Sequence, residues 1–322
     1  MSHRRVALII GTHTWTLETL ENARAILDVL RKYKIDKIDT ARSYGASESA
    51  VGKLKASSEF IIDTKAATGV APGAGQRILE FAAESLKELQ TTKVRTYFLH
   101  APDEDTPVEV QMEAIQTLYK QGMFERFGVS NFTAEQVRKF YDYSKSKGYI
   151  LPTVYQSSYS IAVRLNETHL FPTLRELGIA IQAYSPMAGG LLNKTPEYIQ
   201  QGKGNWDPIT PTGKIFRDLY YKPSYLNMLK EFGKLSEQTG VSRSGLAYRW
   251  VRYHSALKVE LGDEMILGSV TAESLEEAVV ELDKGPLEGW VVKRIDELWE
   301  LIKDDAPVDN LKSVRKIVLG RA

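Results

Sequence analysis

The 322-residue sequence contains no cysteine, no marked excess of charge of either sign and no long apolar run. The absence of cysteine excludes a disulfide framework, a zinc–thiolate site and a catalytic thiol, and it fits a reducing compartment. A net charge of +1 gives no reason to expect nucleic acid or an anionic membrane as a partner. The first apolar run, residues 6–10, is too short for a signal peptide or a membrane span, so a cytoplasmic location is expected.

Strand-like and helix-like segments alternate along the chain. Apolar segments predict eight strands, at residues 6–10, 35–41, 60–66, 94–101, 126–130, 153–156, 179–184 and 265–268. Helical patterns lie between and after them, at residues 17–33, 48–54, 76–90, 108–121, 134–147, 168–177, 225–238, 242–254 and 273–282. This alternation favours a parallel sheet, and eight strands favour its closure. We therefore expect one α/β domain over residues 1–322, a single (β/α)8 TIM barrel.

Two regions fall outside this repeat. Residues 188–224 are rich in Gly, Pro, Thr and Tyr and form a long loop after the seventh strand, and loops of this length are usually functional or mobile. An extra C-terminal amphipathic helix is expected at residues 290–303, followed by a polar tail from Asp304. Near the N-terminus, Ser47 is a candidate cap for the helix at residues 48–54.

Four polar residues follow or end predicted strands in the first third of the chain: Asp39, Tyr44, Lys65 and His100. In a closed parallel barrel, residues at the carboxyl ends of the strands meet at one mouth, where such barrels place their chemistry. A phenol beside an ammonium, with a carboxylate and an imidazole nearby, can deliver a proton. An ordinary ion network at the strand ends is the alternative for any single member of this set.

The chemistry of such a set follows from its functional groups. A free phenol has a pKa near ~10 and is a poor acid at neutral pH unless its anion is stabilised. A charged Lys65 would stabilise that anion, and Asp39 would keep Lys65 charged. His100 would donate to, or position, the oxygen on which negative charge develops.

Three sequence runs carry a resemblance to a known family. DTARSYG at residues 39–45, GVSNF at 128–132 and YSPMAGGLL at 184–192 resemble signatures of the aldo-keto reductase superfamily, and the resemblance covers nearly the whole chain. GPL at residues 285–287 and WEL at 299–301 are similar to the aflatoxin-aldehyde/succinic-semialdehyde reductase branch. The resemblance implies NAD(P)H-dependent reduction of aldehydes or ketones to alcohols. It implies that Tyr44 is the acid, that Lys65 and Asp39 adjust the pKa of Tyr44, and that His100 orients the substrate.

The resemblance also implies a cofactor site and no metal. Ser130, Asn131 and Gln156 would hold the carboxamide of the nicotinamide, and Tyr184 would stack on its ring, although core packing is the alternative for Tyr184 alone. The segment after strand seven would cross the pyrophosphate as a lid, with contacts from Ser185, Pro186, Met187, Gly189, Gly190, Leu191, Lys194 and Lys214. A lone loop lysine is usually only solvated, and this alternative applies to the last two.

The adenosine end departs from the family pattern. Contacts there would come from Gly268, Ser269, Thr271, Ser274 and Glu277, with Asp39 also counted as cofactor-binding. Ser274 and Ala278 stand where relatives carry Arg or Gln and Asn. A helix N-terminus with neutral hydroxyls can still hold a phosphate, so NADPH is expected over NADH, with a modest preference. The tail also lacks the aromatic-Arg ending that can bind a substrate carboxylate, so a preference for acidic aldehydes does not carry over.

A small-molecule carbonyl is the expected partner, with no nucleic acid or membrane and with a homo-oligomer left open. Its pocket would be formed by Trp15, Tyr44, His100, Trp206 and Tyr221, alongside the alternative that Trp206 and Tyr221 only pack the long loop. A second hypothesis is a cofactor-binding docking module resembling potassium-channel β subunits. A barrel glycosidase would need two facing carboxylates, and Asp39 is the one carboxylate placed at the mouth.

Overall fold

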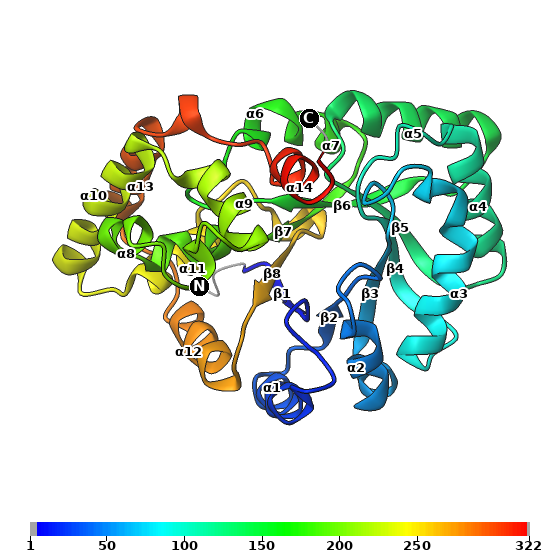
Figure 1. Ribbon diagram of the computed structural model, residues 1–322, viewed down its shortest axis with the longest axis horizontal. Coiled ribbons are helices and arrows are strands. Elements are labelled where there is room, and N and C mark those ends of the chain that lie inside the picture. Colours follow the sequence, from blue (N-terminus) through cyan, green and yellow to red (C-terminus); the bar gives the residue numbers. More distant parts are fainter. Residues whose placement is uncertain (1–4, 321–322) are drawn as a thin grey trace.

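The eight strands of the protein close into a parallel barrel in chain order, as the computed structural model shows for residues 5–320 (Figure 1). Each strand pairs with the next one, and β8 pairs with β1, which places Gly268 opposite Gly11. The strands are β1 Ala7–Gly11, β2 Lys37–Asp39, β3 Ile61–Ala66, β4 Val94–Leu99, β5 Phe124–Ser130, β6 Pro152–Ser158, β7 Ala180–Tyr184 and β8 Glu264–Gly268. The predicted (β/α)8 TIM barrel is confirmed.

Helices surround this barrel (Figure 1). They are α1 Leu20–Tyr33, α2 Ser47–Lys53, α3 Ile78–Leu89, α4 Val108–Lys120, α5 Ala134–Lys147, α6 Asn166–His169, α7 Phe171–Glu176, α8 Pro196–Gln200, α9 Pro211–Tyr220, α10 Pro223–Thr239, α11 Arg243–Tyr253, α12 Ala272–Asp283, α13 Gly289–Glu300 and α14 Leu311–Val318. The helix predicted at residues 290–303 corresponds to α13.

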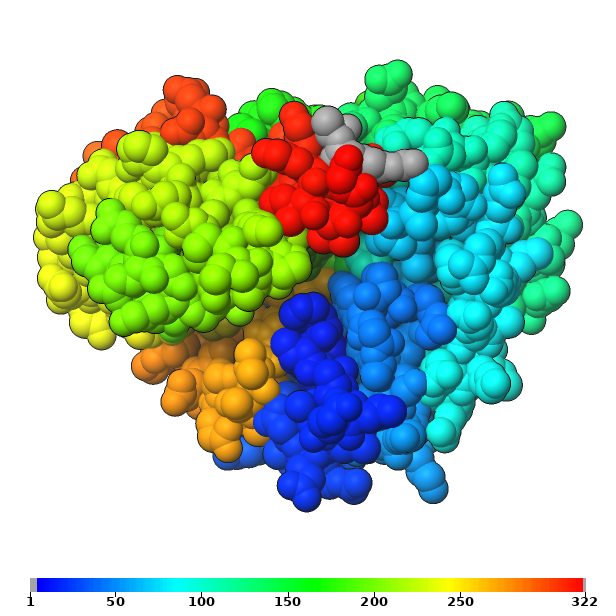
Figure 2. Space-filling view, viewed as in Figure 1, coloured from blue at the N-terminus to red at the C-terminus, as the bar shows by residue number. Residues whose placement is uncertain are grey.

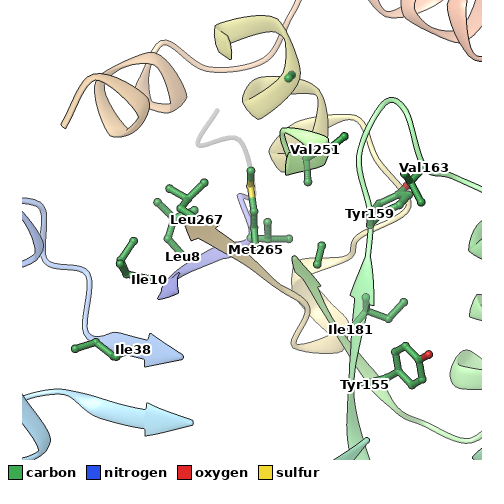
Figure 3. Close-up of a cluster of buried hydrophobic side chains, with 14 of the residues drawn as sticks. Leu8, Ile10, Ile38, Tyr155, Tyr159, Val163, Ile181, Val251, Met265 and Leu267 are labelled. Atoms are coloured by element: carbon green, nitrogen blue, oxygen red, sulfur yellow. The ribbon is translucent and has the colours of Figure 1, made fainter. Parts of the chain in front are cut away.

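The main hydrophobic layer lies between the strands and the helices. Leu8 of β1 and Met265 and Leu267 of β8 lie close together in it, with Val251 of α11 nearby (Figure 3). Barrel strands are covered on both faces, by helices outside and by each other inside, so each strand carries a short apolar run, while polar strand residues such as Asp63 and Gln182 meet inside the barrel. This explains why the strands could be predicted from short continuous apolar runs.

Local hydrogen bonds explain several differences from the predicted helix boundaries. Helix α1 begins at Leu20 rather than residue 17, because Thr16 and Thr19 form a turn in which the Thr16 N–H donates to Thr19 Oγ1 at 2.9 Å. Ser47 is the first residue of α2 and not its cap, and its hydroxyl instead donates to the Thr12 carbonyl at 2.9 Å. The helix predicted at residues 168–177 is two short helices, α6 and α7, separated at Leu170.

The long connection after β7 is largely helical. Besides α8 and α9 it contains two 3-10 turns, η3 Ala188–Asn193 and η4 Gly204–Trp206. Helices α8 and α9 each begin with a Thr-Pro pair, in which the threonine hydroxyl accepts a backbone N–H: Thr195 from Tyr198 and Thr210 from Gly213. An N-cap threonine followed by proline at the first helical position is a strong start signal. The connection is therefore a set of capped short helices.

The tail predicted to be polar contains a further helix, α14. It packs against α9, where Ser313 and Lys316 bind the Asp218 carboxylate at 2.7 and 2.6 Å. On its other side, Arg315 pairs with Glu104 at 3.3 Å and donates to the Pro102 carbonyl. In Figure 2 the red α14 bridges the yellow-green segment that holds α9 and the cyan part of the chain, and the surface is hollowed beside it.

Candidate active site

A buried ion pair lies at the carboxyl ends of β2 and β3. Lys65 Nζ donates to both carboxylate oxygens of Asp39, at 2.8 and 2.7 Å, and to the Thr40 carbonyl at 2.7 Å. Both side chains are almost fully buried. Burial lowers the pKa of Lys65, but the Asp39 carboxylate outweighs this effect, and the net pKa is raised. Lys65 is therefore a fixed ammonium with all three of its N–H groups engaged.

Tyr44 lies against this ammonium. Lys65 Nζ lies 5.0 Å from the centroid of the Tyr44 ring, and the rings of His100 and His13 meet Tyr44 edge-on at 5.5 and 5.7 Å. We expected Lys65 to lower the phenol's pKa. Burial raises the pKa of Tyr44 by more than Lys65 lowers it, so the net shift is upward. The phenol is consequently protonated throughout the physiological pH range.

His100 follows the last residue of β4 and is held by a neighbour. Its Nδ1 lies 2.9 Å from the Ser43 hydroxyl. Burial, reinforced by the Lys65 charge, lowers the pKa of His100 to about 3. The imidazole is thus neutral near pH 7, with one nitrogen as donor and the other as acceptor. The structure brings all four predicted residues, Asp39, Tyr44, Lys65 and His100, to one mouth.

The predicted carboxamide-binding residues lie on β5 and β6 and in the turn after β5. Ser130 Oγ donates to the Gln156 carbonyl at 3.1 Å, and Asn131 Nδ2 donates to the His100 carbonyl at 2.9 Å and to Ser130 Oγ at 3.1 Å. The side-chain nitrogen of Gln156 donates to Asp39 Oδ1 at 2.6 Å. Asn131 has a φ of 61°, a left-handed conformation that asparagine tolerates better than most residues.

Tyr184 ends β7 beside this group. Its hydroxyl lies 2.9 Å from Asn131 Oδ1 and 3.0 Å from the side-chain amide of Asn310 in the C-terminal tail. Both of these asparagine atoms are amide oxygens, and the hydroxyl has one proton, so Tyr184 donates to Asn131 Oδ1 or to Asn310 Oδ1 and not to both at once. The tail therefore reaches the mouth of the barrel.

The segment after Tyr184 turns sharply. Ser185, Ala188, Gly189 and Gly190 all have positive φ, at 57°, 49°, 66° and 92°. A side chain at Gly189 would also meet the Phe216 ring, 2.5 Å from an added Cβ. Pro186 and the half-buried Met187 lie within this turn, and Leu191 follows it. That the backbone of the turn passes close to a ligand stays a prediction.

Other predicted binding residues lie in the segment after β7 and near the N-terminus. Trp206 is 1% exposed and packs on Phe216 and Tyr220, which agrees with the alternative that it packs the segment. Tyr221 is partly exposed under the Arg217 guanidinium, 3.8 Å away. Lys194 stacks on Tyr198 at 4.4 Å, and Lys214 is exposed. Trp15 is buried, and its Nε1 has no hydrogen-bond partner among the described residues.

The residues predicted to bind the adenosine end of the cofactor lie at the end of β8, in the loop that follows it and in α12. Thr271 caps α12 by accepting from the Ser274 N–H, and Ser274 Oγ accepts from the Thr271 N–H, which completes a capping box. The Ser269 hydroxyl donates to the Thr271 carbonyl at 2.8 Å. Gly268 ends β8, and Glu277 is exposed on α12. The hydroxyls predicted to bind a phosphate are therefore engaged with one another at a helix N-terminus.

Sequence reasoning missed several residues that contact the predicted ones, among them Ser43, Gln182 and Asn310. Ser43 lies inside the DTARSYG run and could have been inferred from its proximity to Tyr44. Gln182 is a polar residue in an otherwise apolar strand, which is an available signal. Asn310 had no such signal, because the tail's position depends on tertiary contacts.

Two kinds of feature, a metal-binding cluster and a membrane-spanning helix, are absent from residues 5–320. No group of three or more histidine, aspartate or glutamate side chains there could hold a metal ion. No helix in the same range is long and apolar enough to cross a membrane.

Comparisons with known proteins agree with this fold. The family model for the aldo/keto reductase family matches residues 7–300. Oxidoreductase sirO of Leptosphaeria maculans is 44% identical over 297 residues, which cover 91% of this chain and 90% of that protein.

Two mammalian relatives are similar over most of their length. Aflatoxin B1 aldehyde reductase member 4 of Homo sapiens is 35% identical, with 84% of this chain and 86% of that protein covered. Aflatoxin B1 aldehyde reductase member 2 of Rattus norvegicus is 34% identical, with 85% and 78% covered. The family match spans the barrel and its site, and the chain belongs to the aldo-keto reductase family of oxidoreductases.

Proposed function

We propose that the protein reduces aldehydes or ketones to alcohols with NADPH, and that Tyr44 is the proton donor. The observation that carries the proposal is the Lys65 ammonium, fixed by Asp39 and Thr40 and lying 5.0 Å from the Tyr44 ring. The neutral His100 lies against the same ring, at 5.5 Å. A protonated phenol, a fixed cation and a neutral imidazole together serve one task, the protonation of an oxygen that gains negative charge.

The proton would leave Tyr44 as the carbonyl oxygen becomes an alkoxide. A reduced nicotinamide supplies the hydride when it is bound. The phenol keeps its proton until that moment because burial raises its pKa. Once the proton has moved, Lys65 stabilises the phenolate, and Asp39 holds Lys65 in its charged form.

His100 would orient the carbonyl oxygen. We propose that the Ser43 hydroxyl donates to Nδ1, which would place the proton of the neutral imidazole on Nε2 as the donor toward the mouth. Two donors, the phenol and the imidazole, would therefore converge on one oxygen. Ser43 acts here as a positioning residue, because it selects the tautomer of His100.

The residues around Tyr184 fit a nicotinamide. The oxygen Oε1 of Gln156 accepts no hydrogen bond from the described residues, while its nitrogen is fully used. This free acceptor would take an N–H of the carboxamide, next to Ser130 and Asn131. Tyr184, half-buried and held by two asparagines, would form the stacking face.

The turn after β7 and the loop before α12 would hold the rest of the cofactor. Backbone with positive φ at Ser185, Gly189 and Gly190 would pass close to the pyrophosphate, with the helices after it as a lid. The N-terminus of α12 would attract the 2′-phosphate of NADPH. Because its hydroxyls are neutral, we propose a modest preference over NADH.

For the substrate we propose an aldehyde or ketone without a required carboxylate. Two relatives are named aldehyde reductases, which supports the aldehyde class. Trp15, Tyr44 and His100 would form the pocket wall nearest the reacting oxygen.

Stopped-flow oxidation of bound NADPH by an aromatic aldehyde tests the proposal. Fast multiple turnovers are expected. A single slow turnover would contradict an enzyme and instead fit a cofactor-binding docking module. The absence of any NADPH binding would overturn both functions.

A further inference from the structure

A continuous column of buried polar side chains runs from the Asp39 carboxylate down the inside of the barrel. Gln156 of β6 lies beside Asp39, and Gln182 of β7 is the register partner of Gln156. Glu264 of β8 is the register partner of Gln182. Gln156, Gln182 and Glu264 are 2%, 0% and 5% exposed, so the polar atoms of this column, apart from Gln156 Oε1, depend on partners inside the protein.

The column ends at a group of charged side chains that we call the floor cluster: Lys37, Asp63, Arg95, Arg126 and Glu264. Arg95 donates to Asp63 at 2.9 Å and to Glu264 at 2.9 Å, and Lys37 lies 3.2 Å from Glu264. Burial would raise the pKa of Glu264, but the bonds from Arg95 and its other partners outweigh burial, and the pKa is lowered. Glu264 is therefore an ionised carboxylate, which accepts hydrogen bonds and cannot donate them.

The floor cluster fixes the orientation of the Gln182 amide. Gln182 Nε2 lies 3.0 Å from Asp63 Oδ2 and 2.8 Å from Glu264 Oε2. Two carboxylate acceptors require the nitrogen on that side, so the oxygen of Gln182 must face upward, toward Gln156. The two amide protons of Gln182 are thereby used.

Gln182 in turn fixes Gln156. The Gln156 nitrogen donates one proton to Asp39 Oδ1 at 2.6 Å and the other to Gln182 Oε1 at 2.9 Å. With both protons held, the amide plane is set and Oε1 faces away from both partners. If Gln182 were apolar, one proton alone would tether Gln156, and its amide could rotate about the bond to Asp39.

We propose that Gln182 is a positioning residue. The floor cluster fixes the orientation of its amide, and the Gln182 oxygen in turn fixes the Gln156 amide. Gln156 then presents a fixed hydrogen-bond acceptor to a cofactor carboxamide. This inference rests on the proposed function. It assigns a role in nicotinamide recognition to a side chain that does not touch the nicotinamide. Asp63, Arg95 and Glu264 act one step further away.

The test compares three ligands that differ only at the nicotinamide end. NADPH has a carboxamide N–H₂ group, its 3-acetylpyridine analogue lacks that donor, and 2′-phospho-ADP-ribose lacks the ring. Dissociation constants are measured by calorimetry for the wild type, for Gln182→Met and Gln182→Leu, and for Gln111→Met. Gln111 is the matched control, because it is a buried glutamine that binds backbone carbonyls at Asp103 and Thr106, away from the column.

The wild type should bind NADPH about tenfold more tightly than the acetylpyridine analogue, the effect of roughly one good neutral hydrogen bond. In both Gln182 variants this ratio should fall below about threefold, while 2′-phospho-ADP-ribose binds as in the wild type. Gln111→Met should keep the wild-type ratio. Unchanged binding of 2′-phospho-ADP-ribose also shows that a variant is folded.

Two outcomes would overturn the inference alone. One is a wild type that binds both dinucleotides equally well, and this result does not depend on any variant. The other is a Gln182 variant that is folded and keeps the wild-type ratio. If the wild type bound neither dinucleotide, the proposed function itself would fail.

Discussion

At the residue scale, the four strand-end side chains were predictable because barrel geometry collects the carboxyl ends of its strands. Their order in the sequence was sufficient to place Asp39, Lys65 and His100 together. The balance of pKa effects was not predictable, because it depends on burial. Lys65 was expected to lower the pKa of Tyr44, yet burial reverses the sign.

The neutral state of His100 makes stability depend on pH. Its pKa is about 3 in the folded protein, below the usual 6.5, so the unfolded chain binds the proton more readily between these values. Stability should therefore fall as the pH is lowered through this window, by at most about 1.4 kcal/mol per pH unit from this residue. His100→Gln should reduce this slope in urea unfolding measured from pH 7 to pH ~4.

The same substitution at the exposed His169 of α6 is the control and should leave the slope unchanged. The groups that face His100 are Tyr44, Ser43 and Lys65. An identical slope in His100→Gln and the wild type would show that His100 is not held neutral by the fold.

At the scale of the elements, the barrel's strands were predicted within a few residues of their observed bounds. The connections between them were predicted less completely, because helices α8, α9 and α14 were not expected. The Thr-Pro pairs that start α8 and α9 are visible in the sequence and were outweighed by the Gly and Pro content of residues 188–224. Helix α14 has eight residues, and its sequence alone does not stabilise so short a helix without packing. Tertiary contacts with Asp218 and Glu104 determine its position.

The cap of α9 gives a local test of the segment over the cofactor. Thr210→Ala removes the hydrogen bond from the Gly213 N–H, at 3.0 Å, and should destabilise the helix by about 1 kcal/mol. Hydrogen exchange in residues 211–220 should accelerate about fivefold, with Thr210→Ser close to the wild type. Adding NADPH should slow exchange across residues 188–224, and unchanged exchange on addition would argue against a lid.

The N-terminus of α12 gives a test of cofactor choice. The wild type should bind NADPH about 10–100-fold more tightly than NADH, because the proposed phosphate contacts are neutral hydroxyls and backbone N–H groups. Ser274→Arg should widen this ratio by adding a guanidinium. Ser274→Ala is the control, since it loses the same capping-box contact without adding charge. Titration by tryptophan fluorescence measures both ratios, and a wild-type ratio in the thousands would mean that a cation already reaches the phosphate.

At the scale of the whole molecule, barrel closure followed from the number of alternating segments, and the structure confirms it. The polar column inside the barrel could not be predicted from the number of alternating segments. Which residues of neighbouring strands meet inside depends on the stagger of the strands around the barrel, and periodicity within one strand does not contain that information. Asp63, Gln182 and Glu264 lie on three different strands and meet only after closure.

The floor cluster should contribute strongly to the stability of the closed barrel. Arg95→Met would leave the buried Asp63 and Glu264 carboxylates without their main partner, and breaking a buried pair in this way costs about 3–5 kcal/mol. Urea unfolding measures the change. Arg31→Met, at the exposed pair with Glu59, is the control and should leave the midpoint nearly unchanged. Similar midpoints for the two variants would contradict a structural role for the cluster.

The most direct test of the account is the single-turnover rate of NADPH oxidation by an aromatic aldehyde in Tyr44→Phe. Phenylalanine keeps the ring that contacts Lys65 and His100 and removes only the phenolic hydroxyl, the source of the proton. The rate should fall by at least ~100-fold, the span expected for the loss of a general acid, while the dissociation constant for NADPH stays within about threefold of the wild type. A variant that binds NADPH and oxidises it at close to the wild-type rate would contradict the assignment of Tyr44 as proton donor.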